Sequence, residues 1–228
     1  MRRRRTGAWL AGTVLLAVAA VALRQGNLLP GKHAHRSGAA GRAEQARTDY
    51  PAAGTVSHVA DGDTFTIREG DIIRLLNIDA PEHGDPFSDK AKKRLEQLVL
   101  RKTVKLTYDE EREDRYARLL CHAYVDGKWI NELLVREGMA TVYIVRPNTW
   151  RMDDVIAAQN AARKQKAGLW SLPPPPPEPY YIRSRNSFVF HRPSCRIVTD
   201  ISPKNIEKIR SRGGAFDTGL GPCRTCRP

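Results

Sequence analysis

The stretch RLLNIDAPE, residues 74–82, holds three charged side chains whose types suit phosphate chemistry. Arg74 opens an apolar strand, Asp79 ends it, and Glu82 follows across a proline. Asp63, in the turn sequence ADGDT, precedes another predicted strand. Consecutive strands of a meander lie side by side, so we expect Asp63 to approach Asp79. Two converging carboxylates form a site for a hard cation such as Ca²⁺ or Mg²⁺.

The neighbouring residues can complete a hydrolytic site. The backbone carbonyl of Ala80 can add a metal ligand, and Glu82 can hold or deprotonate a water. Arg74 and Arg118 can bind phosphate, because guanidinium groups match phosphate oxygens and stay charged. Metal, base and arginines are the parts that phosphodiester hydrolysis needs. Each feature taken alone also fits a solvated strand end, a hairpin turn or a surface charge.

The elements that must position these residues follow from the hydrophobic pattern. Apolar alternation predicts five strands, at 55–59, 64–68, 71–78, 104–108 and 116–125. Helical spacing predicts three helices: one capped by Ser88, one over 131–137, and one capped by Asn148 or Thr149 that ends near Gly168. Three strands, a helix and two strands are compatible with a five-stranded OB-fold barrel with helices, of the α+β class.

Charge and composition divide the chain into parts. Residues 53–172, the predicted barrel domain, carry 19 basic and 19 acidic residues, whereas residues 1–52 and residues 180–228 each carry a net charge of +7. The segment PPPPPEP at 173–179 predicts a stiff polyproline II linker. Basic flanks indicate a polyanionic partner, either nucleic acid or anionic lipid.

The N-terminus has the pattern of a targeting segment, residues 1–23. Four arginines precede an uncharged, mostly apolar run at 8–23, which is short for a full membrane span and suits a secretory signal peptide. An uncleaved signal anchor that holds the protein in a membrane is the alternative. Residues 24–52 read as a flexible tether. We therefore expect an exported protein, either periplasmic or extracellular, or anchored in the cell membrane.

Four blocks now make a family visible: VADGDTFTI, IRLLNIDAPE, DRYARLL and VDGKWINELLVREGMATV. In that order, over residues 55–171, they resemble the staphylococcal (micrococcal) nuclease family. That family has an OB-fold and cuts DNA and RNA with Ca²⁺.

The resemblance implies a role for each matching residue. It makes Asp63 and Asp79 calcium ligands, with Ala80 adding its carbonyl, and it makes Glu82 the general base. It makes Arg74 and Arg118 the phosphate-binding pair, and it places Arg115 and Tyr116 near the terminal phosphate of the substrate. The loops after Arg68 and Glu82 are short compared with the best-known member of the family, so details of the substrate pocket are expected to differ.

The C-terminal residues 180–228 carry a second possible metal site. His191, Cys195, Cys223 and Cys226 are spaced H-x₃-C and C-x₂-C, a pattern that suits tetrahedral Zn²⁺. The segment resembles the zinc domain of the Ada DNA-alkylation repair protein, with His191 in place of a cysteine, so we expect a structural rather than a reactive zinc. A disulfide within this segment is the alternative in an exported protein.

Two further expectations concern the cysteines and the C-terminal segment. Cys121 lies within a predicted strand and should be a small buried apolar residue rather than a catalytic thiol. Residues 204–210 are expected to form a helix between the two pairs of zinc ligands.

Together these patterns predict a monomeric, calcium-dependent nuclease for DNA and/or RNA, with its basic zinc segment holding the polyanionic substrate. One alternative is a nuclease fold that only binds nucleic acid. Another is a surface protein whose basic ends bind lipid or cell-wall polymer. The joint presence of Asp63, Arg74, Asp79, Glu82 and Arg118 favours the enzyme.

Overall fold

The computed structural model describes residues 49–228, which fall within one compact unit. The targeting segment and nearly all of the tether, predicted within residues 1–52, lie outside the described residues. Over residues 49–228, no helix is both long enough and apolar enough to cross a membrane.

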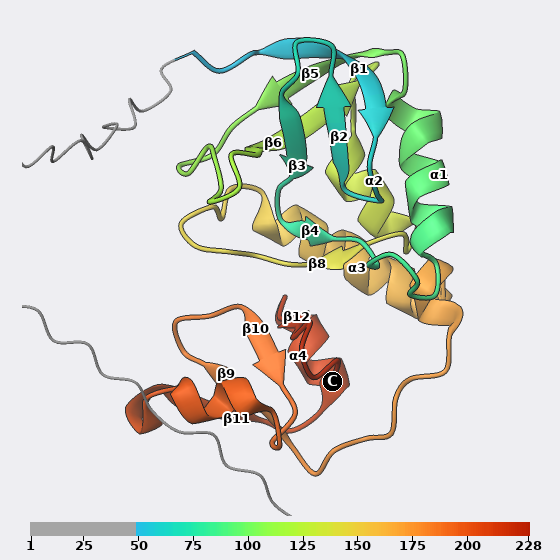
Figure 1. Cartoon of the computed structure of the whole chain (residues 1–228). Helices are drawn as coiled ribbons and strands as arrows, with labels where there is room; N and C mark the ends of the chain where they lie inside the picture. The colour runs from blue at the N-terminus through green and yellow to red at the C-terminus, as the bar shows by residue number, and fades with distance from the viewer. Residues whose placement is uncertain (1–48) are drawn as a thin grey trace, which may run out of the picture. The chain divides into compact units, whose positions relative to one another are not determined.

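A barrel forms the centre of the N-terminal part (Figure 1). Its strands follow the order β3-β2-β1-β5-β6-β7, and a parallel pairing of β3 with β6 closes the sheet. The strands are β1 (Ala53–Val59), β2 (Thr64–Ile67), β3 (Ile72–Leu75), β5 (Thr103–Thr107), β6 (Leu119–Val125) and the short β7 (Lys128–Trp129). The prediction of a five-stranded barrel with helices, consistent with an OB-fold, is confirmed.

The hairpin of β2 and β3 sets the register of the charged residues. Gly70 turns the chain with a φ of +97°, a value that glycine adopts without strain, and its N–H donates to the carbonyl of Ile67. This turn places Thr64 opposite Arg74. Asp63, directly before β2, accepts the N–H of Leu75 at its carbonyl oxygen. The backbone pairing alone therefore brings Asp63 beside Arg74.

A second, short pairing holds the segment after β3. Strand β4 (Ile78–Asp79) pairs antiparallel with β8 (Thr141–Val142), and Asp79 lies opposite Thr141. The 71–78 stretch is thus broken into two strands, because Asn77 adopts a φ of +62° between them. This break turns the chain so that Asp79 belongs to a different sheet from Arg74.

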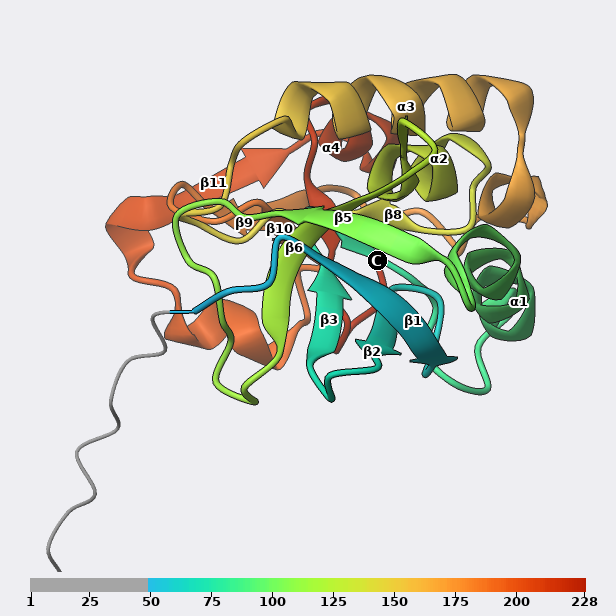
Figure 2. The same ribbon diagram turned by 90° about the horizontal axis from the view of Figure 1, so that it is seen from above.

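Three helices cover the barrel, as Figures 1 and 2 show. They are α1 (Ser88–Val99), α2 (Ile130–Arg136) and α3 (Met152–Gln165), and a 3₁₀ helix, η1 (Gly168–Ser171), follows. The apolar side of α1 buries Ala91, Leu95 and Val99, the spacing that predicted it.

The predicted N-caps of two helices are wrong. Phe87, in the left-handed region, precedes α1, and Ser88 is already helical. Arg151, also left-handed, precedes α3. Asn148 instead exchanges hydrogen bonds with the backbone of Glu111, because a buried amide gains more from satisfying both of its polar atoms than from capping a helix end.

The C-terminal part forms a small sheet in the order β11-β9-β10-β12. Its elements are β9 (Tyr181–Ser184), β10 (Val189–His191), η2 (Arg196–Asp200), η3 (Pro203–Asn205), β11 (Ile206–Ile209), α4 (Arg212–Asp217) and β12 (Gly221–Pro222). Tyr181, Phe190 and Phe216 pack edge to face in its core. We call residues 180–228 the C-terminal module.

The predicted helix over residues 204–210 is wrong. The chain makes one 3₁₀ turn after Pro203 and then pairs as β11 with β9, from Ile206 opposite Ser184 to Ile209 opposite Tyr181. Pairing satisfies the open edge of β9 and packs Ile209 on the small core. Sheet context and burial therefore override local preference here.

Gly62 is packed closely against Ala80 and Ala91, and this packing can be tested by substitution. A Cβ on Gly62 would stand 2.6 Å from the Cβ atoms of both Ala80 and Ala91. We expect Gly62→Ala to lower the free energy of unfolding by about 1–3 kcal/mol, the usual cost of overpacking, as measured by urea unfolding. Gly213→Ala is the control, because its nearest neighbour would be 3.4 Å away. Equal stabilities for the two variants would contradict the assignment of close packing.

Candidate functional site

The buried guanidinium of Arg74, on β3, joins the two predicted calcium ligands. Its Nη2 lies 3.0 Å from Asp63 Oδ2 and 3.0 Å from Asp79 Oδ1. Its Nη1 donates to the carbonyl of Leu75 at 2.6 Å, which fixes the plane of the group. Because both oxygens contact the same nitrogen, Asp63 Oδ2 and Asp79 Oδ1 lie at most twice 3.0 Å apart. The structure thus brings Asp63, Arg74 and Asp79 together, as the meander predicted.

Asp63 is the most enclosed acid of this cluster, and only 5% of it is exposed. Its Oδ1 accepts the hydroxyl of Thr64 at 3.0 Å, and its Oδ2 accepts the N–H of Ala80 at 2.7 Å. Burial raises the pKa of Asp63 to about 7, with the nearby charges of Asp61 and Asp79 adding to the rise and Arg74 opposing it. A further cation at this cluster would favour the ionised carboxylate.

The donor set fits a hard divalent cation. Two carboxylates converge, one of them with its pKa raised by enclosure, and oxygen ligands are those that calcium takes. Ala80 is close enough to participate, but the contact that it makes with Asp63 uses its N–H. The role of its carbonyl as a ligand stays a prediction.

Glu82 lies at the rim, beyond Asp79 and Pro81. Its side chain is 60% exposed, so water reaches it freely. Its partner is a residue that sequence reasoning missed: Arg224, from the loop before the C-terminus, whose Nη1 lies 3.4 Å from Glu82 Oε1. The same arginine also forms an ion pair with Asp79 and lies over the ring of Tyr143.

The other predicted substrate residues form a separate group in the turn before β6. Asp114 organises it: its Oδ1 accepts the N–H groups of Tyr116 and Arg118, and its Oδ2 accepts Arg118 Nε at 2.8 Å. Partial burial opposes ionisation of Asp114, but these hydrogen bonds hold its pKa below the usual value. Arg115 donates to the hydroxyl of Tyr116 at 2.7 Å.

This turn is connected to the Arg74 cluster through the barrel. Arg118 directly precedes β6, in which Leu120 pairs with Arg74. Within residues 49–228, no hydrogen bond or ion pair joins Arg118 to Asp63 or Asp79. Arg118 thus lies two residues before the partner of Arg74 on the neighbouring strand, and Asp114 holds its side chain, 30% of which is exposed.

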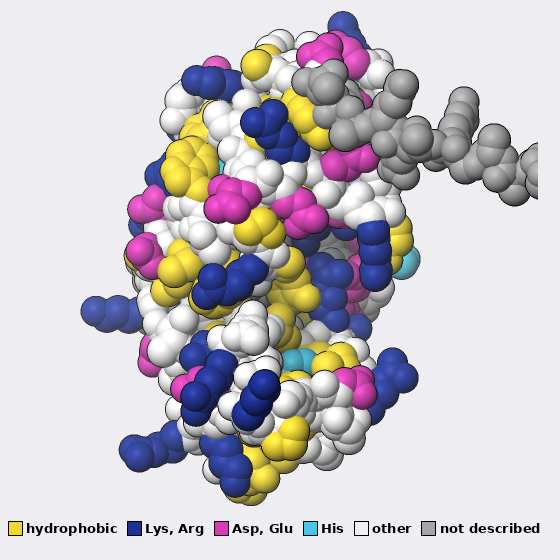
Figure 3. Space-filling view, turned by 90° about the vertical axis from the view of Figure 1, so that its left-hand side faces the viewer, with side chains coloured by type: hydrophobic (Ala, Val, Ile, Leu, Met, Phe, Trp, Pro, Cys, Tyr) yellow, Lys and Arg dark blue, Asp and Glu magenta, His cyan; other side chains and the backbone are white. Residues whose placement is uncertain are grey.

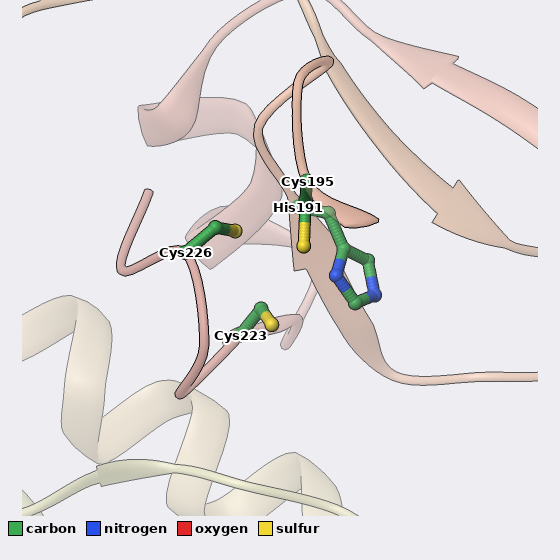
Figure 4. Close-up of side chains that lie close together, drawn as sticks. All are labelled: His191, Cys195, Cys223 and Cys226. Atoms are coloured by element: carbon green, nitrogen blue, oxygen red, sulfur yellow. The ribbon is translucent and has the colours of Figure 1, made fainter. Parts of the chain in front are cut away.

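The C-terminal module brings its four predicted zinc ligands together (Figure 4). One ligand atom from each of His191, Cys195, Cys223 and Cys226 lies within 4.8 Å of the others, and the cysteines are free. The Nδ1 atom of His191 is buried without a hydrogen-bond partner. An orphaned imidazole nitrogen beside three thiols fits a tetrahedral metal site. Cys121 lies elsewhere, fully buried in β6, and burial raises its pKa to about 12.

The sequence carried only a weak signal for Arg224. The residue lies between two predicted zinc ligands in the block CRTC, and this position indicates a role within the C-terminal module only. Its partner Asp79 is 145 positions away, and contacts at such separation leave no periodicity in one sequence.

Comparisons with known proteins agree with this geometry. The model of the family described as "Staphylococcal nuclease homologue" matches residues 72–172. An uncharacterized endonuclease of Escherichia coli O157:H7 is 41% identical over 137 residues, which cover 58% of this chain and 85% of that protein. A micrococcal nuclease of Shigella flexneri is 36% identical over 134 residues, or 53% of this chain and 74% of that protein.

Other relatives are longer than the matched region. The SPbeta prophage-derived endonuclease YokF of Bacillus subtilis is 36% identical over 128 residues, which cover 51% of this chain but only 43% of that protein. The family match covers the chain from β3 to η1, including Arg74 and Asp79, whereas β1, β2, Asp63 and the C-terminal module lie outside it. On this identity and coverage, the chain belongs to the staphylococcal nuclease family.

Proposed function

We propose that the protein is a calcium-dependent nuclease that hydrolyses phosphodiester bonds of DNA and/or RNA. The observation that carries the proposal is the convergence of Asp63 and Asp79 on Arg74, with Glu82 at the rim. Relatives that carry the names endonuclease and micrococcal nuclease support it. We further propose that the protein acts as a monomer outside the cytoplasm, periplasmic, extracellular or membrane-anchored, as the arginine-led apolar segment at 2–23 suggests.

The side chains would divide the chemistry between them. Asp63, Asp79 and the carbonyl of Ala80 would hold the calcium ion, which when bound polarises a phosphate oxygen and stabilises developing negative charge. Glu82, exposed to solvent, would take a proton from the attacking water.

The arginines would act on the phosphate itself. Arg74 and Arg118 would donate hydrogen bonds to oxygens of the scissile phosphate, whose negative charge increases in the transition state. Arg115 and Tyr116, in the exposed turn, would contact the terminal phosphate of the substrate.

A plasmid-digestion assay separates this proposal from the alternatives. The nuclease should cut with Ca²⁺, stop in chelator and resume when Ca²⁺ is restored. A binding module would retain DNA without cutting it, and a surface protein would bind anionic vesicles or cell-wall polymer in preference to DNA. Cleavage at the full rate in chelator would exclude the proposed metal site.

The proposed base and phosphate ligand can be tested by substitution. We expect Glu82→Gln and Arg118→Ala each to lower kcat by at least about 100-fold, the scale for a lost acid–base group or a lost charge-stabilising donor. Folding should persist, because both side chains are partly or mostly exposed. Steady-state kinetics with circular dichroism provide the measurement, and turnover near wild type in either variant would refute the role of that residue.

Calcium affinity should depend on pH through Asp63. Calcium requires the ionised carboxylate, so binding should weaken by up to about tenfold per pH unit below the raised pKa of about 7. Calorimetric titration at pH 6, 7 and 8 measures this slope, and Asp63→Asn should abolish both the slope and most of the affinity. A slope that persists in Asp63→Asn would assign the titration to another group.

In the metal-free protein, the free energy of unfolding should decrease as the pH rises, whereas the calcium affinity increases. The folded pKa of Asp63 lies above its unfolded value of 3.8, so its contribution favours folding at low pH and is lost as the pH rises through about 7.

We also propose a structural zinc ion in the C-terminal module, held by His191, Cys195, Cys223 and Cys226. The module has only 49 residues and a small aromatic core, so it needs such a staple. We expect Cys223→Ser to lose the zinc and unfold the module. Elemental analysis and near-UV circular dichroism measure both effects.

Cys121→Ser is the matched control, because that thiol is buried in the barrel, away from the cluster. It should retain one equivalent of zinc. A disulfide in the purified protein, or full zinc content in Cys223→Ser, would contradict the site.

A further inference from the structure

The guanidinium of Arg224 engages both oxygens of Asp79. Its Nε lies 3.0 Å from Oδ2, its Nη2 bonds to Oδ1, and its Nη1 lies 3.4 Å from Glu82 Oε1. Oδ1 of Asp79 also accepts Arg74 Nη2. Guanidinium groups therefore contact both oxygens of this proposed calcium ligand.

The C-terminal module is docked so that Arg224 faces this edge. Arg227 Nη1 lies 2.6 Å from Asp85 Oδ1, and Arg163 of α3 lies 2.5 Å from Asp217 of α4. The backbone around Arg224 is also fixed, since Cys223 donates its N–H to the carbonyl of Phe190. The contact between Arg224 and Asp79 is thus one of several contacts that hold the C-terminal module against the barrel domain.

Solvent nevertheless reaches the interaction from the arginine side. The side chain of Arg224 is 47% exposed and that of Asp79 is 13% exposed, and a cavity of about 1040 Å³ reaches Asp79, Glu82 and Arg224. Lys and Arg side chains also gather around a hollow on the separate face of the molecule that Figure 3 shows. Exposed ion pairs contribute only about 0.2–1 kcal/mol, so a divalent cation can displace this one.

We propose that Arg224 is an internal competitor of calcium, which occupies Asp79 and Glu82 in the metal-free protein and must leave Asp79 when calcium binds. The proposal rests on the calcium site of the proposed function. It makes the C-terminal module a regulator of that site, where the sequence suggested only a holder of substrate. The orientation of the guanidinium favours competition over phosphate binding, because Nε, Nη1 and Nη2 all face carboxylates of the barrel.

The test is direct calcium binding to the full-length, zinc-loaded protein in the absence of nucleic acid. Arg224→Gln removes the charge but keeps a polar side chain of similar reach. Calorimetry should give a Kd for calcium about two- to fivefold lower than that of wild type, the fold-change that corresponds to losing an exposed ion pair. Arg224→Lys, which keeps the charge but not the fork, should fall between the two.

The matched control is Arg196→Gln. Arg196 follows Cys195 as Arg224 follows Cys223, it is exposed, and it has no ion pair within the described chain. Removing it changes the net charge of the module by the same amount, so its calcium Kd should equal that of wild type. If the calcium Kd of Arg196→Gln fell as far as that of Arg224→Gln, the effect would come from the net charge of the module, and the proposal would be overturned.

The remaining outcomes separate this proposal from the proposed function. Equal calcium affinity in wild type and Arg224→Gln would overturn the competition while leaving the calcium site intact. No calcium binding by either protein would overturn the calcium site and the competition with it. Unchanged calcium affinity together with weaker binding of a short single-stranded oligonucleotide in chelator would show that Arg224 is a phosphate ligand instead.

Discussion

The guanidinium of Arg74 is the constraint on which the site depends. Asp63 directly precedes β2 of the barrel and Asp79 lies in the separate pair of β4 and β8, and close to each other in a poorly solvated place the two acids would repel. Arg74 offsets that repulsion in part, but it is one positive charge between two negative ones, so these three side chains keep a net negative charge when both acids are ionised. A site that is assembled by one cation thereby stays able to attract a second.

Much of this arrangement could be predicted from the sequence, because it depends on local features. Alternation predicted the strands at 64–68 and 71–78. The hairpin between them turns at Gly70 and places Asp63 beside Arg74 without help from distant residues. The zinc ligands were equally visible, since their spacing is local within each pair. Their convergence across 27 intervening residues followed from the coordination that four such ligands require.

Three of the errors share one physical cause, which is competition from partners far along the chain. Asn148 bonds Glu111 instead of capping a helix, and Ile206–Ile209 pairs with β9 instead of forming a helix. Arg224 was missed for the same reason, because its position between two cysteines says nothing of Asp79. Local preferences amount to fractions of a kcal/mol per residue, and a buried hydrogen bond or a sheet edge outweighs them.

The position of Arg224 on the rim has a thermodynamic consequence for how the site responds to its ligands. A charge that calcium must displace from Asp79 is afterwards free to meet the phosphates of an arriving strand, and a strand that holds it leaves Asp79 open. Linked equilibria are reciprocal, so each ligand would raise the affinity for the other by the same factor. On the scale of an exposed ion pair, the presence of either ligand would raise the affinity for the other by about two- to fivefold.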